Sequence, residues 1–229
     1  MRILSIVALG LAVVVAACSS DSTTTSTTTT SGDSSTSAAG LTLVADTAAL
    51  GNSVAAGSTV PVTVHVFQGT APAGDVLVSW TVNAGGGTVA APTTLTDSNG
   101  VATIGWTVGD TITTNTMTAD IVGANVTITT VTVAGPTSTL TRVSPDSQAV
   151  VAGAGLTITA RPVDRFGNPV QGVTVTWSAT GGTLSAAATT SGNLGDATTN
   201  FITDATPGTY QVTASVAGRA SVTFTIVGS

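Results

Sequence analysis

The chain has 229 residues and a formal net charge of −6, and charged residues make up only 7% of it. All five bases are Arg and all eleven acids are Asp, so Lys and Glu, two residues that favour helices, are absent. An acidic chain without a basic cluster is excluded as a nucleic-acid-binding protein, because such binding depends on neutralising phosphates. Abundant Thr, Val and Gly instead favour β-structure, and a single Cys excludes an internal disulfide.

Residues 1–17 have the pattern of a secretory signal peptide. One basic residue precedes an apolar run of about fifteen residues, which is too short to span a bilayer comfortably. The run closes with Val15, Ala16 and Ala17 before Cys18, and this sequence resembles the lipobox of bacterial lipoproteins. The resemblance implies cleavage before Cys18 and attachment of a diacylglycerol to its thiol. The alternatives are an ordinary secretory signal followed by a chance Cys and an uncleaved anchor.

Residues 18–40 are predicted to be the lipidated Cys18 and a disordered tether. After Cys18 the segment contains only Ser, Thr, Gly, Ala and Asp, so it has no apolar side chains large enough to form a core. A flexible coil of this length reaches about 25 Å, and two or three acyl chains would hold it firmly in a membrane. By analogy with Gram-negative lipoproteins, Ser19 rather than Asp after the Cys points to the outer membrane.

From residue 41 onward, short runs of alternating apolar and polar residues are separated by Gly, Asn, Pro and Asp. Runs of five to seven residues with period-2 alternation, divided by frequent turn signals, predict antiparallel strands of a β-sandwich. The fold class is therefore all-β. The clearest runs are 60–66, 76–80, 126–129, 156–160, 173–177 and 222–226.

The two halves of this region align with each other, which indicates a tandem duplication. Gly and Trp positions recur at an offset of 95 to 97 residues, as in Trp80 and Trp177, so two small indels account for the drift. The boundary falls near Ala134, which divides the chain into domains 41–134 and 135–229. The first domain carries five Asp and no base, whereas the second carries four Asp and four Arg.

Two turn motifs stand out in this region: Asp-x-x-Gly-Asn-Pro-Val at residues 164–170, and Thr-Asp-x-x-Gly-x-Ala before a strand at residues 96–102. Both resemble turns of bacterial Ig-like domains of the invasin and intimin type. Each half keeps one motif well and blurs the other. The resemblance implies an Ig-like sandwich, and it implies a role in cell adhesion or as a spacer. The motif residues are Asp164, Gly167, Asn168 and Pro169 in the second domain, and Asp97, Asn99 and Gly100 in the first.

Other conspicuous residues are assigned to structure rather than to chemistry. The Asp97 loop lacks the later carboxylate of a calcium loop, so we expect a hairpin turn there, and likewise at Asp164 and Asp196. His65 alternates with apolar residues and is expected on the outer face, where no second His could complete a zinc site. Three Trp residues are expected in the cores rather than on a sugar-stacking platform: Trp80 and Trp177 at equivalent strand ends, and Trp106.

The sequence thus predicts a lipid-anchored surface protein whose tandem Ig-like domains act as an adhesion or spacer module. The alternative is a lipoprotein that binds a glycan, a cation or a protein partner through exposed loops of the sandwiches. No enzymatic activity, cofactor or metal is expected, because the only His has no nucleophile elbow near it and turn aspartates lack a pocket that would raise a pKa.

Overall fold

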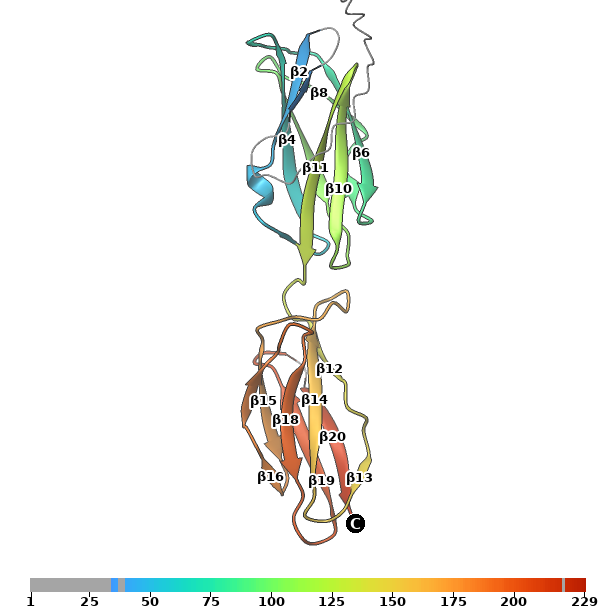
Figure 1. Ribbon diagram of the computed structural model, residues 1–229, viewed down its shortest axis with the longest axis vertical. Helices are drawn as coiled ribbons and strands as arrows, with labels where there is room; N and C mark the ends of the chain where they lie inside the picture. Colours follow the sequence, from blue (N-terminus) through green and yellow to red (C-terminus); the bar gives the residue numbers. More distant parts are fainter. Residues whose placement is uncertain (1–33, 37–39, 220) are drawn as a thin grey trace, which may run out of the picture.

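Two β-sandwiches stacked end to end make up the computed structural model, which describes residues 34–36, 40–219 and 221–229 (Figure 1). Their strands confirm the predicted all-β fold, and the only helix in the described ranges is one 3-10 turn, η1 (Ala48–Leu50). No helix in these ranges is long and apolar enough to cross a membrane. The predicted signal peptide, Cys18 and Ser19 lie outside the described residues.

The first domain packs two sheets face to face. One sheet has the order β1-β2-β4-β9-β7, with β5 beside β4, and the other has the order β3-β11-β10-β6-β8. All of these pairs are antiparallel except β3 with β11, which is parallel. The strands are β1 (Ser34–Thr36), β2 (Leu41–Asp46), β3 (Val54–Ala55), β4 (Thr59–Gln68), β5 (Ala71–Pro72), β6 (Leu77–Ala84), β7 (Thr88–Val89), β8 (Thr93–Leu95), β9 (Val101–Thr107), β10 (Thr114–Ile121) and β11 (Ala124–Val133).

The second domain repeats this topology, as the predicted duplication requires. Its sheets have the orders β12-β14-β18-β16 and β13-β20-β19-β15-β17, and the pair β13–β20 is again parallel. Each of these strands matches a strand of the first domain, whereas β1 and β5 have no counterpart strand among the described residues of the second. The strands are β12 (Thr139–Arg142), β13 (Gln148–Val150), β14 (Gly155–Val163), β15 (Thr174–Ala179), β16 (Thr183–Leu184), β17 (Ala188–Thr190), β18 (Ala197–Ile202), β19 (Gly208–Ser215) and β20 (Ser221–Gly228).

Alternating side chains build each core. In β4, Val62, Val64 and Val66 are fully buried, whereas Thr63 and His65 between them are half-buried on the outer face. Successive side chains of a strand point to opposite faces, so the sequence pattern decides which face meets the opposite sheet. The outer position predicted for His65 is therefore confirmed.

The three Trp residues lie in the cores, as predicted. Trp106 is fully buried, and Trp80 and Trp177 are 3% and 5% exposed. Trp80 lies within β6 and Trp177 within β15, rather than at the strand ends that the sequence suggests. The indole N–H groups of Trp80 and Trp177 each donate to a Thr hydroxyl of the neighbouring strand at 2.8 Å, at Thr94 and at Thr189, whereas Nε1 of Trp106 has no hydrogen-bond partner among the described residues.

One short strand lies where the sequence predicts a disordered tether. Ser34–Thr36 forms β1, which pairs antiparallel with Thr42–Val44 of β2. The polar composition of the segment gives no reason to expect a strand. However, backbone N–H and C=O groups along a sheet edge can pair with any extended chain, whatever its side chains are. The prediction of disorder is therefore wrong for these three residues.

Candidate functional site at the junction between the domains

The Asp97 motif forms a turn closed by its own carboxylate. Oδ1 of Asp97 accepts hydrogen bonds from the backbone N–H groups of Asn99 and Val101, both at 2.9 Å. Gly100 has a φ of 71°, and its N–H donates to the carbonyl of Asp97. The backbone hydrogen bond to Val101 is the main reason that the pKa of Asp97 lies below its usual value. The carboxylate of Asp97 therefore stabilises its own turn through local hydrogen bonds.

This turn is not the hairpin that the sequence suggests. It joins β8 of one sheet to β9 of the other, so the chain crosses between the sheets at this point. The local pattern of Asp and Gly specifies the sharp change of direction but not which sheet receives the next strand. No cluster of three potential metal ligands occurs in the described ranges.

The Asp164 motif has the same hydrogen-bond pattern in the second domain, but here an antiparallel bridge between Val163 and Pro169 closes the loop as the predicted hairpin. Oδ1 of Asp164 accepts hydrogen bonds from the N–H groups of Phe166 and Asn168, both at 2.9 Å, and the N–H of Gly167, at a φ of 87°, donates to the Asp164 carbonyl. The other carboxylate oxygen, Oδ2, accepts from the side chain of Asn168 at 2.9 Å and from the N–H of Gly135 at 3.0 Å. The turn is thereby bonded to the linker between the domains.

Four hydrogen bonds keep Asp164 ionised although it is 2% exposed. Burial by itself raises the pKa of this carboxyl, but the hydrogen bonds from Asn168, Gly135 and Phe166 together outweigh burial, so the pKa lies below its ordinary value. These hydrogen bonds occupy both oxygens of the carboxylate. Asp164 therefore holds the turn together and is not free to bind a ligand.

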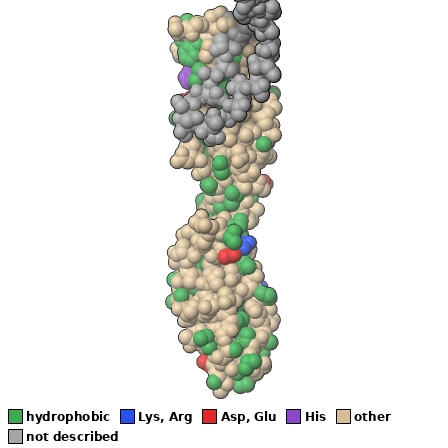
Figure 2. Space-filling model, viewed as in Figure 1, with side chains coloured by type: hydrophobic (Ala, Val, Ile, Leu, Met, Phe, Trp, Pro, Cys, Tyr) green, Lys and Arg blue, Asp and Glu red, His purple; other side chains and the backbone are tan. Residues whose placement is uncertain are grey.

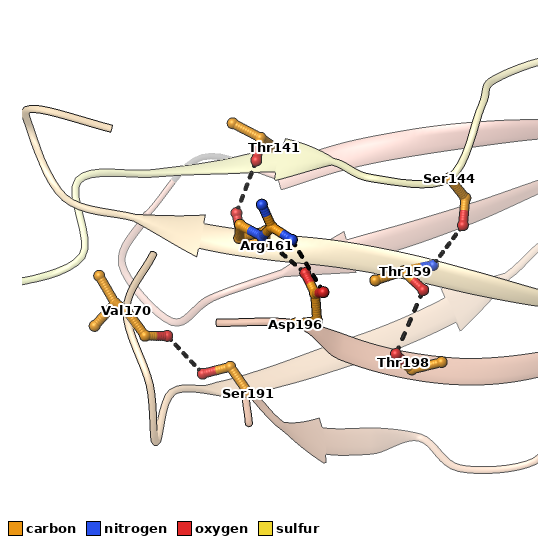
Figure 3. Close-up of polar contacts among 8 residues, drawn as sticks. All are labelled: Thr141, Ser144, Thr159, Arg161, Val170, Ser191, Asp196 and Thr198. Atoms are coloured by element: carbon orange, nitrogen blue, oxygen red, sulfur yellow. Dashed lines mark hydrogen bonds and ion pairs between the residues drawn. The ribbon is translucent and has the colours of Figure 1, made fainter. Parts of the chain in front are cut away.

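The two motif regions of the second domain pack against each other. A Cβ on Gly195 would lie 2.5 Å from Cβ of Pro169, so only glycine fits there. Beside this contact the hydroxyl of Ser191 donates to the carbonyl of Val170 at 2.7 Å (Figure 3) and accepts from the N–H of Val173. The buried Ser191 therefore joins the two motif regions.

The first domain uses Thr96 in the same way. Its hydroxyl donates to the carbonyl of Ala73 at 2.7 Å and accepts from the N–H of Val76. Sequence reasoning missed Thr96 and Ser191 as structural residues. The available signal is their spacing of 95 residues, within the range that relates the two copies.

Asp196 forms an ion pair, although the sequence suggests only a turn. Its two carboxylate oxygens accept from Nε and Nη2 of Arg161 at 2.8 and 3.0 Å (Figure 3). Arg161 lies on β14, and Asp196 immediately precedes β18, the strand that pairs with β14. The first domain has His65 and Val101 at the corresponding positions, so this ion pair belongs to the second copy alone.

The exposed tip of the Asp164 turn reaches the first domain. Nη2 of Arg165 donates to the carbonyl of Gly57 at 3.0 Å, and Nδ2 of Asn168 donates to the carbonyl of Asp110 at 2.7 Å. The ring of Phe166 lies where a side chain on Gly57 would be, because a Cβ there would come within 2.3 Å of Cζ. The motif that sequence analysis assigns to turn chemistry thus also holds the two domains together.

A cavity of about 340 Å³ opens beside these contacts. In the space-filling view the molecule narrows to a waist between the two domains (Figure 2). Residues of the first domain, the linker and the second domain all line the cavity: Ala55, Ala56, Ser58, Gly135, Pro136, Thr137, Ser138, Asp164, Arg165, Phe166 and Arg219.

Comparison with known proteins agrees with this architecture. Residues 137–227 match the model of the bacterial Ig-like domain (group 1). The solved structure of FdeC, an Escherichia coli adhesin, is 18% identical, with a TM-score of 0.51, and the alignment covers 77% of this chain and 62% of that one. Together these establish the Ig-like fold. No curated protein sequence matches the chain significantly.

Two further solved structures are similar to the chain at lower TM-scores. Invasin, described as a bacterial integrin-binding protein, is 27% identical with a TM-score of 0.40, over 82% of this chain and 39% of that one. The D00-D0 domain of intimin is 16% identical with a TM-score of 0.44, over 82% of this chain and 99% of that one. The chain thus spans well under two thirds of the invasin structure and slightly under two thirds of the FdeC structure.

Proposed function

We propose that this chain, whose second sandwich is a bacterial Ig-like domain, is an envelope lipoprotein in which two tandem Ig-like domains form an adhesion or spacer stalk. Cys18 supplies the lipid anchor in this proposal, and the segment after it lifts the stalk from the membrane. The contacts at the junction are the observation that supports a stalk, because a spacer keeps its two ends apart only if its domains do not fold back on each other.

Three contacts at the junction support a stiff stalk. Arg165 and Asn168 each donate a hydrogen bond to a backbone carbonyl of the first domain, and Phe166 packs against Gly57. The linker is fixed as well, because the N–H of Gly135 donates to Asp164. Interfaces between domains of one chain usually permit the domains to move relative to each other. Here the contacts come from a turn that is itself held by four hydrogen bonds, and this rigidity opposes such motion.

The proposal assigns the chain no catalytic step. The carboxylates of Asp97, Asp146, Asp164 and Asp196 accept hydrogen bonds in turns or in ion pairs. The fold of this chain is similar to that of FdeC, an adhesin, and of invasin, an integrin-binding protein, and this likeness supports a role at the cell surface.

The anchor is tested by replacing Cys18. Cys18→Ser is expected to abolish labelling with a radioactive fatty acid and to move the protein from the membrane fraction to the soluble fraction. Ser20→Ala, two residues further on, is the matched control and should leave both readouts unchanged. A Cys18→Ser protein that remains in the membrane fraction would overturn the lipoprotein assignment.

The outer-membrane assignment is tested by replacing Ser19. Ser19→Asp is expected to shift the protein from the outer to the inner membrane in a density gradient, whereas Ser19→Ala should not. Equal distribution of the wild type and Ser19→Asp would contradict sorting by this residue.

A further inference from the structure

The ionisable groups that line the junction cavity carry a net positive charge. Asp164, Arg165 and Arg219 are its only charged wall residues, and the wall residues from the first domain are uncharged. Asp164 is saturated by its four hydrogen bonds, so its carboxylate has no lone pair left to bind a cation or a sugar hydroxyl. A ligand in this cavity therefore meets two guanidinium groups.

These two arginines differ from the other two of the second domain. Arg142 pairs with Asp146 and Arg161 pairs with Asp196. Neither Arg165 nor Arg219 has a carboxylate partner among the described residues, and of the Arg165 nitrogens only Nη2 finds an acceptor there. An arginine left without an anion retains donors that suit the geometry of a carboxylate.

The rest of the wall has the character of a sugar-binding site. Phe166 is 41% exposed although its ring stacks with Arg165, 4.4 Å from the guanidinium carbon to the ring centroid. Ser58, Thr137 and Ser138 add hydroxyl groups. Binding sites for small molecules combine apolar or aromatic walls with a few polar groups and measure roughly 300 to 1,000 Å³, so this cavity suits a ligand of one or two sugar units.

We propose that the cavity between the two domains binds a carboxylated sugar, with the carboxylate on Arg219 and Arg165, a C–H face of the pyranose on Phe166, and the hydroxyls on Ser58, Thr137 and Ser138. A uronic acid within a surface polysaccharide has this chemistry. The site goes beyond the stalk function, because a stiff stalk needs no ligand, and the binding experiment does not depend on the lipid anchor.

The test is a titration of the ¹⁵N-labelled chain carrying Cys18→Ser, followed by amide chemical shifts. Sodium glucuronate is expected to shift the amides of Ser58, Thr137 and Arg219 with saturation, whereas glucose and sodium acetate should bind at least about tenfold more weakly, the difference expected from losing the charge-assisted contact or the apolar contact. Glucose 6-phosphate keeps both an anion and a pyranose face, and it should bind no more tightly than glucuronate. Absence of saturable shifts with glucuronate, or equal binding of glucose or acetate, would overturn the proposal. Preference for glucose 6-phosphate would replace the carboxylate with a phosphate and would equally overturn it.

Two arginine variants locate the site. Arg219→Gln is expected to weaken glucuronate binding by about tenfold or more, because an ionic hydrogen bond to the ligand is lost while no described contact between the domains involves Arg219. Arg142→Gln removes the same charge from another exposed site of the same domain and should leave binding unchanged. Equal loss in both variants would show that binding follows net charge and not the cavity.

Discussion

At the scale of single residues, one buried carboxylate links turn, linker and domain contact. Asp164 orients the N–H groups of Phe166 and Asn168, fixes the side chain of Asn168 and holds Gly135 of the linker. Asn168 in turn donates to the first domain. Because the carboxylate accepts every one of these bonds, its removal leaves several partly buried donors without an acceptor inside the protein, and such donors are costly.

Replacement of Asp164 should destabilise the second domain. We expect Asp164→Ala to lower its free energy of unfolding by about 2 kcal/mol, since four hydrogen bonds to a buried carboxylate are lost and partly buried N–H groups lose their acceptor. Asp97→Ala, in the exposed turn of the first domain that has the same local hydrogen-bond pattern, is the matched control and should cost less. Urea unfolding followed by the fluorescence of Trp177 reports on the second domain if Trp80 and Trp106 are replaced by Phe, and the fluorescence of Trp80 and Trp106 reports on the first domain if Trp177 is replaced by Phe. An equal loss in both variants would contradict the role given to burial.

Acid should weaken the same turn. The pKa of Asp164 lies below its ordinary value, so its contribution is complete at neutral pH and disappears as the pH falls below about 4, through the folded pKa. The wild type should therefore lose stability below about pH 4 more steeply than Asp164→Ala, in which this proton uptake is absent. Thermal unfolding between pH 2 and 7 measures the two slopes, and parallel slopes would refute this account.

At the scale of elements, one turn motif serves two purposes in the two domains. In the first domain the full Asp-x-x-Gly turn crosses between sheets at Asp97, and the position that corresponds to Asp164 holds only the tight Gly69–Thr70 connection between β4 and β5. In the second domain the full turn lies at Asp164, where it meets the neighbouring domain. The two copies therefore differ in the loop that, in the second domain, contacts the first domain.

The part of this arrangement that the sequence predicts is local. Alternation predicts which Val residues of β4 are buried, and Asp, Gly and Pro predict sharp turns, because both depend on neighbouring residues only. The contacts of Arg165 and Asn168 with Gly57 and Asp110 depend on how two separately folded units meet, which no local pattern encodes. The strand β1 is unexpected for a similar reason, because its pairing depends on an open sheet edge.

The close contact at Gly57 gives a prediction with a control in the other copy. Gly57 and Gly153 have φ angles of 65° and 83°, so an Ala at either position is strained by about 1 kcal/mol. Only at Gly57 would the new methyl group strike Phe166, whereas at Gly153 the nearest atom lies at 3.8 Å. Gly57→Ala should therefore loosen the junction, seen as independent tumbling of the domains in ¹⁵N relaxation, and Gly153→Ala should not. Loosening in both would assign the effect to backbone strain.

At the scale of the whole molecule, the described residues form a rod of two stacked sandwiches with one junction between them (Figure 1). Most of its visible surface consists of uncharged polar side chains and backbone, with apolar side chains scattered across it (Figure 2). The two cores are separate clusters of buried residues, so each sandwich is stabilised by its own packing and the junction contributes orientation rather than core. Whether the chain acts as a stalk therefore depends on the few contacts between the Asp164 turn and the first domain.

The most direct test of the stiff junction is a distance measurement between the domains. Because the chain has a single Cys, a Cys18→Ser background allows spin labels at Val122→Cys and Leu194→Cys, two sites that are 87% and 75% exposed. Double electron–electron resonance should give one narrow distance distribution, which should broaden when Arg165→Ala and Asn168→Ala remove both hydrogen bonds to the first domain. A broad distribution in the unaltered junction, or the same width after both replacements, would contradict the rigid stalk.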